Sequence, residues 1–270
     1  MALLEVKNLS YVYGENSPFS IKALRDVSVG FDKGELVAVI GQTGSGKSTL
    51  LMHLNGLLKP ASGDVLFDGK SIFESKRALR NARFNVGLCF QYPEHQLFEA
   101  TVRRDIAFGP KNMGLSDAEV SERVLWAASL AGFPEELLDK SPFDLSGGEK
   151  RRAAIAGVMA MRPGVLILDE PTAGLDPGGS ADMLRLIEEY NKNTGSTVIF
   201  VSHDMDAVAR LAKRVLVMNK GEVAAFDTPE RVFSDERVLG SGLDVPEITR
   251  ILTCQQCGSF ARFTYSGRFR

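Results

Sequence analysis

The chain has 270 residues, of which 44% are hydrophobic and 24% are charged, and its formal net charge is -2. This length accommodates one large domain with at most a small appendage, and the composition is typical of a soluble globular protein. The near-neutral charge argues against a general nucleic-acid binder, which needs an excess of Lys and Arg. No apolar run is long enough to cross a bilayer, and the N-terminus lacks the pattern of a secretion signal. We therefore expect a cytoplasmic protein that reaches a membrane only through a partner.

The first elements predicted are strands that lead into a glycine-rich loop. Residues 3–6 and 27–31 are predicted as edge strands, and residues 36–40 as a buried strand. A helix is predicted over 47–56, after a loop with the P-loop pattern. In a P-loop the glycines let the backbone wrap a phosphate, the lysine reaches the terminal phosphates and the following serine holds Mg²⁺. The loop and its continuation read Gly41, Gln42, Thr43, Gly44, Ser45, Gly46, Lys47, Ser48 and Thr49.

Two further strands are predicted before the chain becomes helical. Residues 63–67 form a short strand closed by an Asp-Gly turn, which predicts antiparallel structure beside the nucleotide strand. Residues 86–90 form another buried run, which ends at Gln91. The Gln91 amide can accept a hydrogen bond from water or coordinate a hard cation, although a polar residue at a strand end is more often structural.

A stretch of helical periodicity follows over residues 101–143. It is clearest over 117–132, where a Ser116 cap precedes apolar residues spaced three and four apart. We expect a small helical subdomain over about residues 95–145, inserted in a nucleotide-binding domain that spans residues 1–240.

Helices and apolar strands alternate in the remainder of the domain, which predicts a mostly parallel sheet covered on both faces. A turn over 219–221 leads to a last strand, and residues 241–270 are predicted as a short C-terminal extension. Cys254 and Cys257 have the spacing of half a zinc site, but no second pair follows, so metal binding is not expected. The predicted helices are 147–161, 180–193 and 205–211, and the strands are 165–168, 198–201 and 215–218.

Polar residues at two strand ends suggest phosphate chemistry. Asp169 and Glu170 end the strand at 165–168, where the first acid can hold Mg²⁺ and the second can polarise an attacking water. His203 follows the strand at 198–201; alone it would be read as structural, but its position near the two acids favours a role at a terminal phosphate.

A second glycine motif lies about a hundred residues after the first, with the sequence Leu145-Ser146-Gly147-Gly148-Glu149, and a basic helix follows it. Taken in order with the P-loop, Gln91, residues 166–170, Ala173-Gly-Leu-Asp176 and His203, it resembles the nucleotide-binding domain of an ABC transporter. The resemblance implies an α/β fold of the P-loop NTPase class with an antiparallel β subdomain and a small helical subdomain.

The resemblance also implies roles for individual residues. Gln91, Glu170 and His203 would be catalytic, and Ser48, Gln91 and Asp169 would hold Mg²⁺. Ser146, Gly147, Gly148 and Asp176 would bind ATP together with the P-loop. Tyr13 would stack on adenine, with Tyr11 as the alternative. Glu149 stands where many members have Gln, and Gly178-Gly179 is a flexible start for a helix.

A finer resemblance, to the second of two paralogous ATPases in energy-coupling factor transporters, rests on the segments 91–98, 105–112, 141–148 and 242–248. It implies vitamin or transition-metal uptake at the cytoplasmic face of a prokaryotic membrane. The expected partners are a paralogous ATPase or a self-copy, a transmembrane coupling protein and a substrate-binding membrane subunit, with no nucleic acid. Residues 92–98 would form a short helix near the coupling protein.

In the arrangement of this family each ATP lies between the P-loop of one subunit and the serine-glycine motif of the other. The chain alone would then bind ATP but hydrolyse it poorly until paired. Two alternatives remain: a soluble ABC ATPase that acts on ribosomes or DNA, and a homodimer that serves a different transporter.

Overall fold

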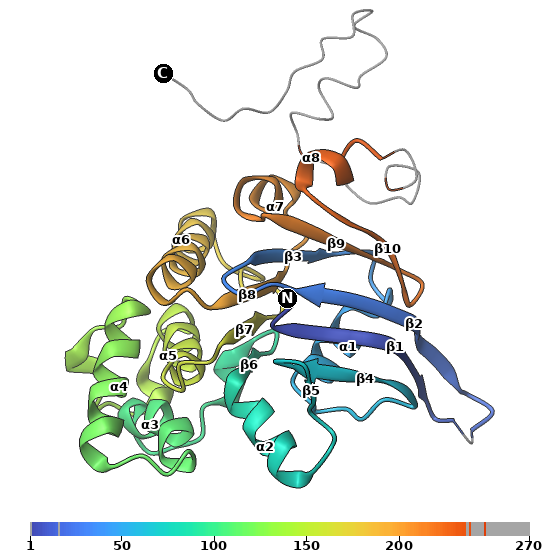
Figure 1. The fold of residues 1–270 in the computed structure, drawn as a ribbon. Helices are drawn as coiled ribbons and strands as arrows, with labels where there is room; N and C mark the ends of the chain where they lie inside the picture. The colour runs from blue at the N-terminus through green and yellow to red at the C-terminus, as the bar shows by residue number, and fades with distance from the viewer. Residues whose placement is uncertain (1, 16, 236–237, 239–245, 247–270) are drawn as a thin grey trace, which may run out of the picture.

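The computed structural model describes residues 2–15, 17–235, 238 and 246. Its N-terminal part forms a four-stranded antiparallel sheet in the order β2-β1-β4-β5 (Figure 1). The prediction of an edge strand at residues 27–31 is confirmed by β2, which ends this sheet, but the same prediction for residues 3–6 was wrong, because β1 lies between β2 and β4. Both strands are longer than predicted. Register shifts interrupt the alternation of buried and exposed residues after Val6, which hides the second half of β1 from a pattern search. The strands are β1 (Leu4–Tyr13), β2 (Ile21–Phe31), β4 (Ser62–Phe67) and β5 (Lys70–Ser71).

The second sheet has six strands in the order β10-β9-β3-β8-β7-β6. All neighbouring pairs are parallel except β9 and β10, which confirms the mostly parallel sheet. The strands are β3 (Leu36–Ile40), β6 (Val86–Cys89), β7 (Val165–Leu168), β8 (Thr197–Val201), β9 (Arg214–Asn219) and β10 (Glu222–Asp227).

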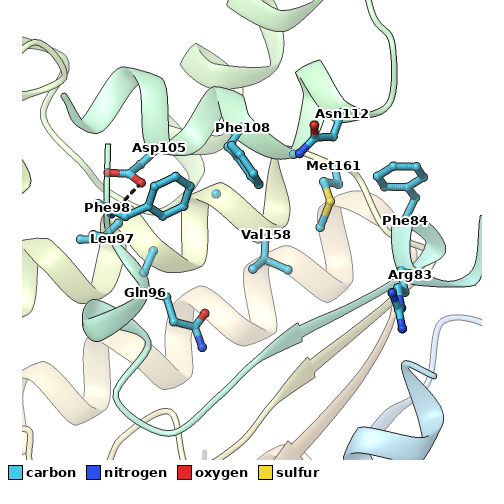
Figure 2. Close-up of a pocket in the computed structure, with 14 residues that line it drawn as sticks. Arg83, Phe84, Gln96, Leu97, Phe98, Asp105, Phe108, Asn112, Val158 and Met161 are labelled. Atoms are coloured by element: carbon cyan, nitrogen blue, oxygen red, sulfur yellow. Dashed lines mark hydrogen bonds between the residues drawn. The ribbon is translucent and has the colours of Figure 1, made fainter. Parts of the chain in front are cut away.

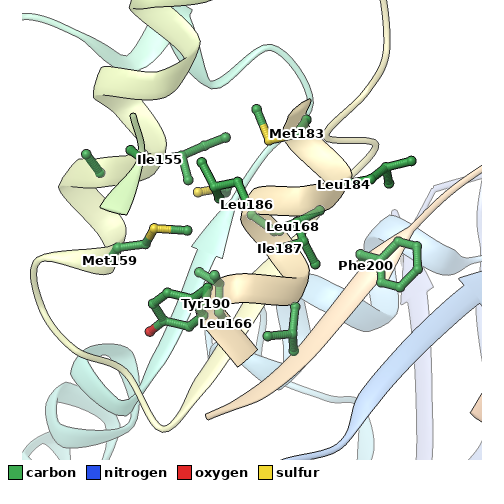
Figure 3. Close-up of a cluster of buried hydrophobic side chains, with 14 of the residues drawn as sticks. Ile155, Met159, Leu166, Leu168, Met183, Leu184, Leu186, Ile187, Tyr190 and Phe200 are labelled. Atoms are coloured by element: carbon green, nitrogen blue, oxygen red, sulfur yellow. The ribbon is translucent and has the colours of Figure 1, made fainter. Parts of the chain in front are cut away.

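The parallel sheet separates two apolar clusters. Val37 and Val39 of β3 join the cluster on one face, together with α1 (Lys47–Leu54) and the antiparallel sheet. Ala38 and Ile40 join the cluster on the other face, with the helical part of the chain. Since successive strand residues point to opposite faces, β3 contributes to both clusters, and so do β6, β7, β8 and β9. Figure 3 shows the second cluster where α5 (Gly147–Met159) and α6 (Pro177–Thr194) meet the sheet.

The expected helical stretch holds two α-helices, α3 (Val102–Asn112) and α4 (Asp117–Leu130), and the short 3₁₀ helices η2 (Glu135–Leu137) and η3 (Pro142–Asp144). The Ser116 cap is present as a capping box, in which Ser116 and Glu119 each bond to the other's backbone N–H. α2 (Lys76–Asn85) was not predicted: its side chains have helical spacing, but the segment is polar overall and Ala82 is its only buried residue.

The helix α6 begins at Pro177, three residues before the predicted start. Asp176 caps it by accepting a 2.7 Å hydrogen bond from the Gly179 N–H, so Gly178 and Gly179 form its first turn. A side-chain carbon at Gly179 would lie 2.8 Å from the Asp176 carboxylate, and glycine therefore leaves room for the cap. The remaining helices are η1 (Pro93–Gln96), α7 (Met205–Leu211) and α8 (Pro229–Val232).

Among the described residues, no helix has the length and apolar character that a membrane span requires. Cys254, Cys257 and most of the predicted C-terminal extension lie outside the described residues.

Candidate active site

The P-loop connects β3 to α1 and has the backbone conformation that its glycines allow. Gly41 and Gly46 have φ values of 152° and 101°. A side-chain carbon at Gly41 would lie 2.3 Å from the carbonyl oxygen of Met218, and one at Gly46 would lie 2.7 Å from that of Ala23. Glycine is therefore required at both positions by the chain's own packing, and the loop can close around a phosphate.

Lys47 is nearly buried within this loop. Its ammonium group donates hydrogen bonds of 2.8 Å to the carbonyl of Gly41 and 3.1 Å to that of Gln42. Burial lowers its pKa, and the nearby carboxylates of Glu170 and Asp169 act in the opposite direction. A cation held in this way is placed to accept an incoming anionic phosphate.

Asp169 follows β7 and is 8% exposed. Burial raises the pKa of its carboxyl group, while a hydrogen bond with the Ser48 side chain and the charge of Lys47 lower it. The structure thus brings together Ser48 and Asp169, two of the three residues predicted to hold Mg²⁺.

Glu170 is held between two other predicted residues. Its Oε2 accepts a 2.9 Å hydrogen bond from the Gln91 amide, and its Oε1 lies 2.9 Å from Nε2 of His203. The three residues follow β6, β7 and β8, which are neighbours in the parallel sheet, and the carboxyl ends of such strands share one edge. Glu170 adopts φ 49°, an uncommon conformation for a non-glycine residue that is often found at functional sites.

The two candidate tyrosines differ in their surroundings. Tyr11 is partly buried with its ring 4.7 Å from that of His53, whereas Tyr13 is 38% exposed. The Tyr13 hydroxyl lies 3.3 Å from that of Thr49, in the helix that follows the P-loop. Of the two tyrosines, Tyr13 is the more exposed and lies beside the P-loop, which favours it over Tyr11 for stacking on a base.

The serine-glycine motif is located away from the P-loop, at the N-terminus of α5. This helix packs on the sheet face opposite to α1, and in Figure 1 the strands β6 and β7 lie between them. Ser146 forms a capping box with Glu149. Side-chain carbons at Gly147 or Gly148 would meet nothing within 4 Å, so neither glycine is required by the packing of this chain. Their missing side chains leave the helix N-terminus open to an approaching anion.

Sequence reasoning missed Arg151, on the first turns of α5. This residue is 3% exposed, and its guanidinium forms an ion pair with Glu94 of η1. The only signal was its place in the basic run after Glu149, and nothing in the sequence shows that it is buried.

A groove lies beside η1, with a volume of about 390 Å³ (Figure 2). It is bounded by α2, η1, α3 and α5, and its lining includes Phe98 and Phe108, which are 61% and 47% exposed. The two rings meet edge to face at 5.0 Å. This is an exposed aromatic surface next to the segment that continues from Gln91.

Within the part of the chain that is described, no cluster of three His, Cys, Asp or Glu residues could hold a metal. A magnesium site of the predicted kind does not need such a cluster, because Mg²⁺ is usually bound by one or two carboxylates together with substrate phosphates and water.

Comparison with known proteins identifies the family. The model of the ABC transporter family matches residues 24–173. The chain belongs to the ABC transporter family. A model described as "AAA domain, putative AbiEii toxin, Type IV TA system" also matches, over residues 138–209.

Relatives named energy-coupling factor transporter ATP-binding protein EcfA2 include one from Caldanaerobacter subterraneus subsp. tengcongensis. It is 51% identical over 249 residues, which cover 92% of this chain and 87% of that protein. The relative of the same name from Symbiobacterium thermophilum is 52% identical and covers 88% and 83%. These similarities place the chain among the ATPases of energy-coupling factor transporters, rather than among ABC proteins that act on ribosomes or DNA.

Solved structures agree with this assignment. CbiO1 from Clostridium perfringens, described as part of the ABC transporter complex CbiONQ, matches with a TM-score of 0.78 and 41% identity, covering 93% of this chain and 98% of that one. A dimeric ATP-binding cassette bound to ADP and Pi matches with a TM-score of 0.75 and 28% identity, covering 84% and 98%. The predicted ABC ATPase fold is confirmed.

Proposed function

We propose that this chain binds ATP at its P-loop and hydrolyses it with Glu170 as the general base, in order to drive import through membrane partners. The observation that supports this most directly is the position of Glu170, whose two oxygens are held by Gln91 and His203. A carboxylate fixed in this way can accept a proton from a water aimed at the terminal phosphate. His203 keeps the carboxylate oriented and can contact the phosphate in turn.

Magnesium fits the same edge of the sheet. The Ser48 hydroxyl and the Asp169 carboxylate are hydrogen-bonded to each other, and both offer the hard oxygen ligands that Mg²⁺ prefers. Gln91 could add its amide oxygen. The bound ion would neutralise charge on the phosphates, and Lys47 would contribute to the same stabilisation.

The second half of each ATP site is proposed to come from another ATPase subunit. Gly147 and Gly148 lie open on α5, on the opposite sheet face from α1, so they are placed for an ATP bound elsewhere than at the chain's own P-loop. Asp176, which caps α6, would lie at the same interface. The dimeric state of a solved relative bound to ADP and Pi supports such a pairing.

The test of the catalytic assignment is Glu170→Gln. We expect the rate of ATP hydrolysis by the paired ATPase to fall by at least roughly a hundred-fold, because a general base contributes 10²–10⁴-fold. ATP binding, measured by equilibrium dialysis, should remain within about two-fold of wild type. The matched control is Glu122→Gln, since Glu122 lies on α4 in an exposed ion pair with Arg162. Hydrolysis by Glu170→Gln at the rate of the control would remove Glu170 from the role.

The membrane partner is proposed to dock in the groove beside η1. The relatives are named as ATP-binding proteins of transporters, and one solved relative is described as part of a transporter complex. An apolar helix of a transmembrane coupling protein would cover Phe98 and Phe108, which are exposed in the isolated chain. This contact would hold the chain at the cytoplasmic face of the membrane, and a further membrane subunit would bind the transported vitamin or metal ion.

Copurification from detergent-solubilised membranes tests the partners. We expect a paralogous ATPase and membrane proteins to be recovered with the chain, and Phe98→Asp to lose the membrane proteins while keeping the ATPase. Recovery of a second copy of this chain with membrane proteins, and of no paralogous ATPase, would indicate a homodimer in place of the proposed heterodimer. Recovery of the chain alone would contradict the transport assignment.

A further inference from the structure

One buried arginine connects three segments of the chain that belong to different parts of the machinery. The Arg151 guanidinium donates to both oxygens of Glu94, at 3.2 Å from Nε and 3.1 Å from Nη2. Its Nη1 donates to the carbonyl of Pro171 at 3.2 Å and to that of Ala173 at 2.6 Å. The Tyr92 ring lies 5.8 Å from the guanidinium carbon. Arg151 therefore uses all three of its nitrogens within the protein interior.

Each of the three segments joined by Arg151 belongs to a different functional region. Glu94 lies in η1, which borders the groove and follows Gln91. Arg151 itself lies in α5, four residues after the Gly147 that opens the helix. Pro171 and Ala173 lie one and three residues after Glu170 in the chain. A single side chain thus joins the groove, the open end of α5 and the loop that carries the catalytic carboxylate.

The chemistry of the contact resists separation of the three segments. Arg151 is 3% exposed and the Glu94 side chain is 17% exposed, so neither charge can exchange its partner for water without leaving the other buried and unpaired. The guanidinium is planar, so the fork that binds Glu94 and the edge that binds the two carbonyls are fixed relative to each other. A displacement of η1 must therefore either move α5 and residues 171–173 or break these bonds.

The residue that leads into η1 has a left-handed backbone conformation. Tyr92 precedes η1 with φ 57°, which is uncommon for a bulky residue. Its backbone turns the chain from the strand end at Gln91 into η1, while its ring faces the guanidinium.

We infer that Arg151 is a positioning residue that transmits displacement of η1 to both half-sites of the chain, the open end of α5 and the loop after Glu170. The inference rests on the proposed function for the meaning of the two half-sites, but the mechanical link itself is a property of the isolated chain. It adds to the proposed mechanism a route between the membrane-facing groove and the ATP sites.

The link is tested first by hydrogen exchange on the isolated chain, with Glu94→Gln and Arg151→Lys. Glu94 has no hydrogen bond to residues 171–175 among the described residues, yet we expect Glu94→Gln to raise amide exchange there by roughly five-fold, because the released guanidinium loosens its carbonyl contacts. Arg151→Lys keeps the charge but loses the fork, and should raise exchange by roughly ten-fold both there and in residues 92–97.

The matched control is Arg162→Lys. Arg162 is also an arginine with a carboxylate partner, Glu122, and an aromatic ring, Trp126. Its backbone N–H bonds to Met159 at the end of α5, but within the described part of the chain its side chain forms no hydrogen bond or ion pair with η1, α5 or residues 171–173. It should leave exchange at 92–97 and 171–175 unchanged. Unchanged exchange at 171–175 in Glu94→Gln would overturn the inference, since a purely local role of the ion pair would not reach that loop.

The rate of ATP hydrolysis by the ATPase pair then tests whether Arg151 positions the two half-sites. We expect Arg151→Lys to lower kcat by about ten-fold while KM stays within about two-fold, because the nucleotide is still bound but the two half-sites are misaligned. Equal kcat in Arg151→Lys and Arg162→Lys would overturn the positioning role. An inactive wild-type pair would instead count against the proposed function, and the exchange result would still decide whether the link exists.

Discussion

The N-termini of α4 and α5 are built alike but differ in what surrounds them. In both, the cap serine and a glutamate three residues later form a capping box. The serine hydroxyl donates to the glutamate at 2.6 Å in Ser116–Glu119 and at 2.7 Å in Ser146–Glu149. The return bond to the serine oxygen is 3.4 Å in each. As helix starts, the two are equivalent.

The difference lies in the two residues between the serine and the glutamate. α4 has Asp117 and Ala118, whereas α5 has Gly147 and Gly148, in open space and without a positive φ. Glycine lowers helix stability here and relieves no clash within the chain. A cap motif predicts where a helix begins, whereas the two missing side chains leave the N-terminus of α5 open, as the proposed phosphate contact requires.

The largest effect is expected from Gly148→Asp, and Ala118→Asp is its counterpart on α4. Both positions are exposed and second in their helices, where a carboxylate favours the helix dipole. We expect neither variant to lower the unfolding midpoint. Gly148→Asp should nevertheless reduce hydrolysis by the ATPase pair by roughly a hundred-fold or more, because it places a negative charge where a phosphate is proposed to bind.

Ala118→Asp should leave hydrolysis unchanged. Equal activity of the two variants, measured as kcat with the same ATPase partner, would mean that the open end of α5 faces solvent rather than ATP.

Much of this site could be predicted because its parts are local in sequence or share a sheet edge. The P-loop is contiguous, and Gln91, Glu170 and His203 follow parallel strands, whose ends must meet. The Arg151–Glu94 pair could not be predicted, since its members are 57 residues apart and only tertiary packing buries them. The helix α2 was missed for a different reason, because its segment is polar overall and buries only Ala82, although its side chains have helical spacing.

A smaller effect is expected from removing each cap hydroxyl. Ser116→Ala and Ser146→Ala should each lower the free energy of unfolding by about 1 kcal/mol, since each removes one cap bond at a helix start. Only Ser146→Ala should also slow hydrolysis, by roughly ten-fold, because its hydroxyl is proposed to reach the phosphate as well. Urea unfolding and steady-state kinetics measure the two quantities separately. A ten-fold lower rate of hydrolysis in Ser116→Ala as well would mean that the loss of helix stability, and not a lost phosphate contact, slows both variants.

Replacing the glutamate of the α5 capping box should raise the apparent affinity for ATP, whereas the same replacement on α4 should not. Glu149→Gln removes a negative charge beside the proposed phosphate site, and the amide oxygen can still accept the serine bond. We expect the apparent affinity of the ATPase pair for ATP to rise by about two- to three-fold at low salt, and by less in 0.5 M salt, which screens surface charges. Glu119→Gln should have no effect in either condition. A gain that persists at high salt would exclude charge as its origin.

The smallest difference should appear in the titration of the two carboxyl groups. Hydrogen bonds from Ser146 lower the pKa of Glu149 below its ordinary value, and bonds from Ser116 lower the pKa of Glu119. A carboxyl group with a lowered pKa stabilises the fold at pH values above its ordinary pKa of about 4.5. This stabilisation is lost as the pH falls through the pKa of the folded state. In the isolated chain, NMR titration should therefore show both groups protonating below pH 4.5. Pairing in the presence of ATP should raise the pKa of Glu149 alone, because only that carboxylate then faces a phosphate, and a parallel rise at Glu119 would remove the distinction between the two helix ends.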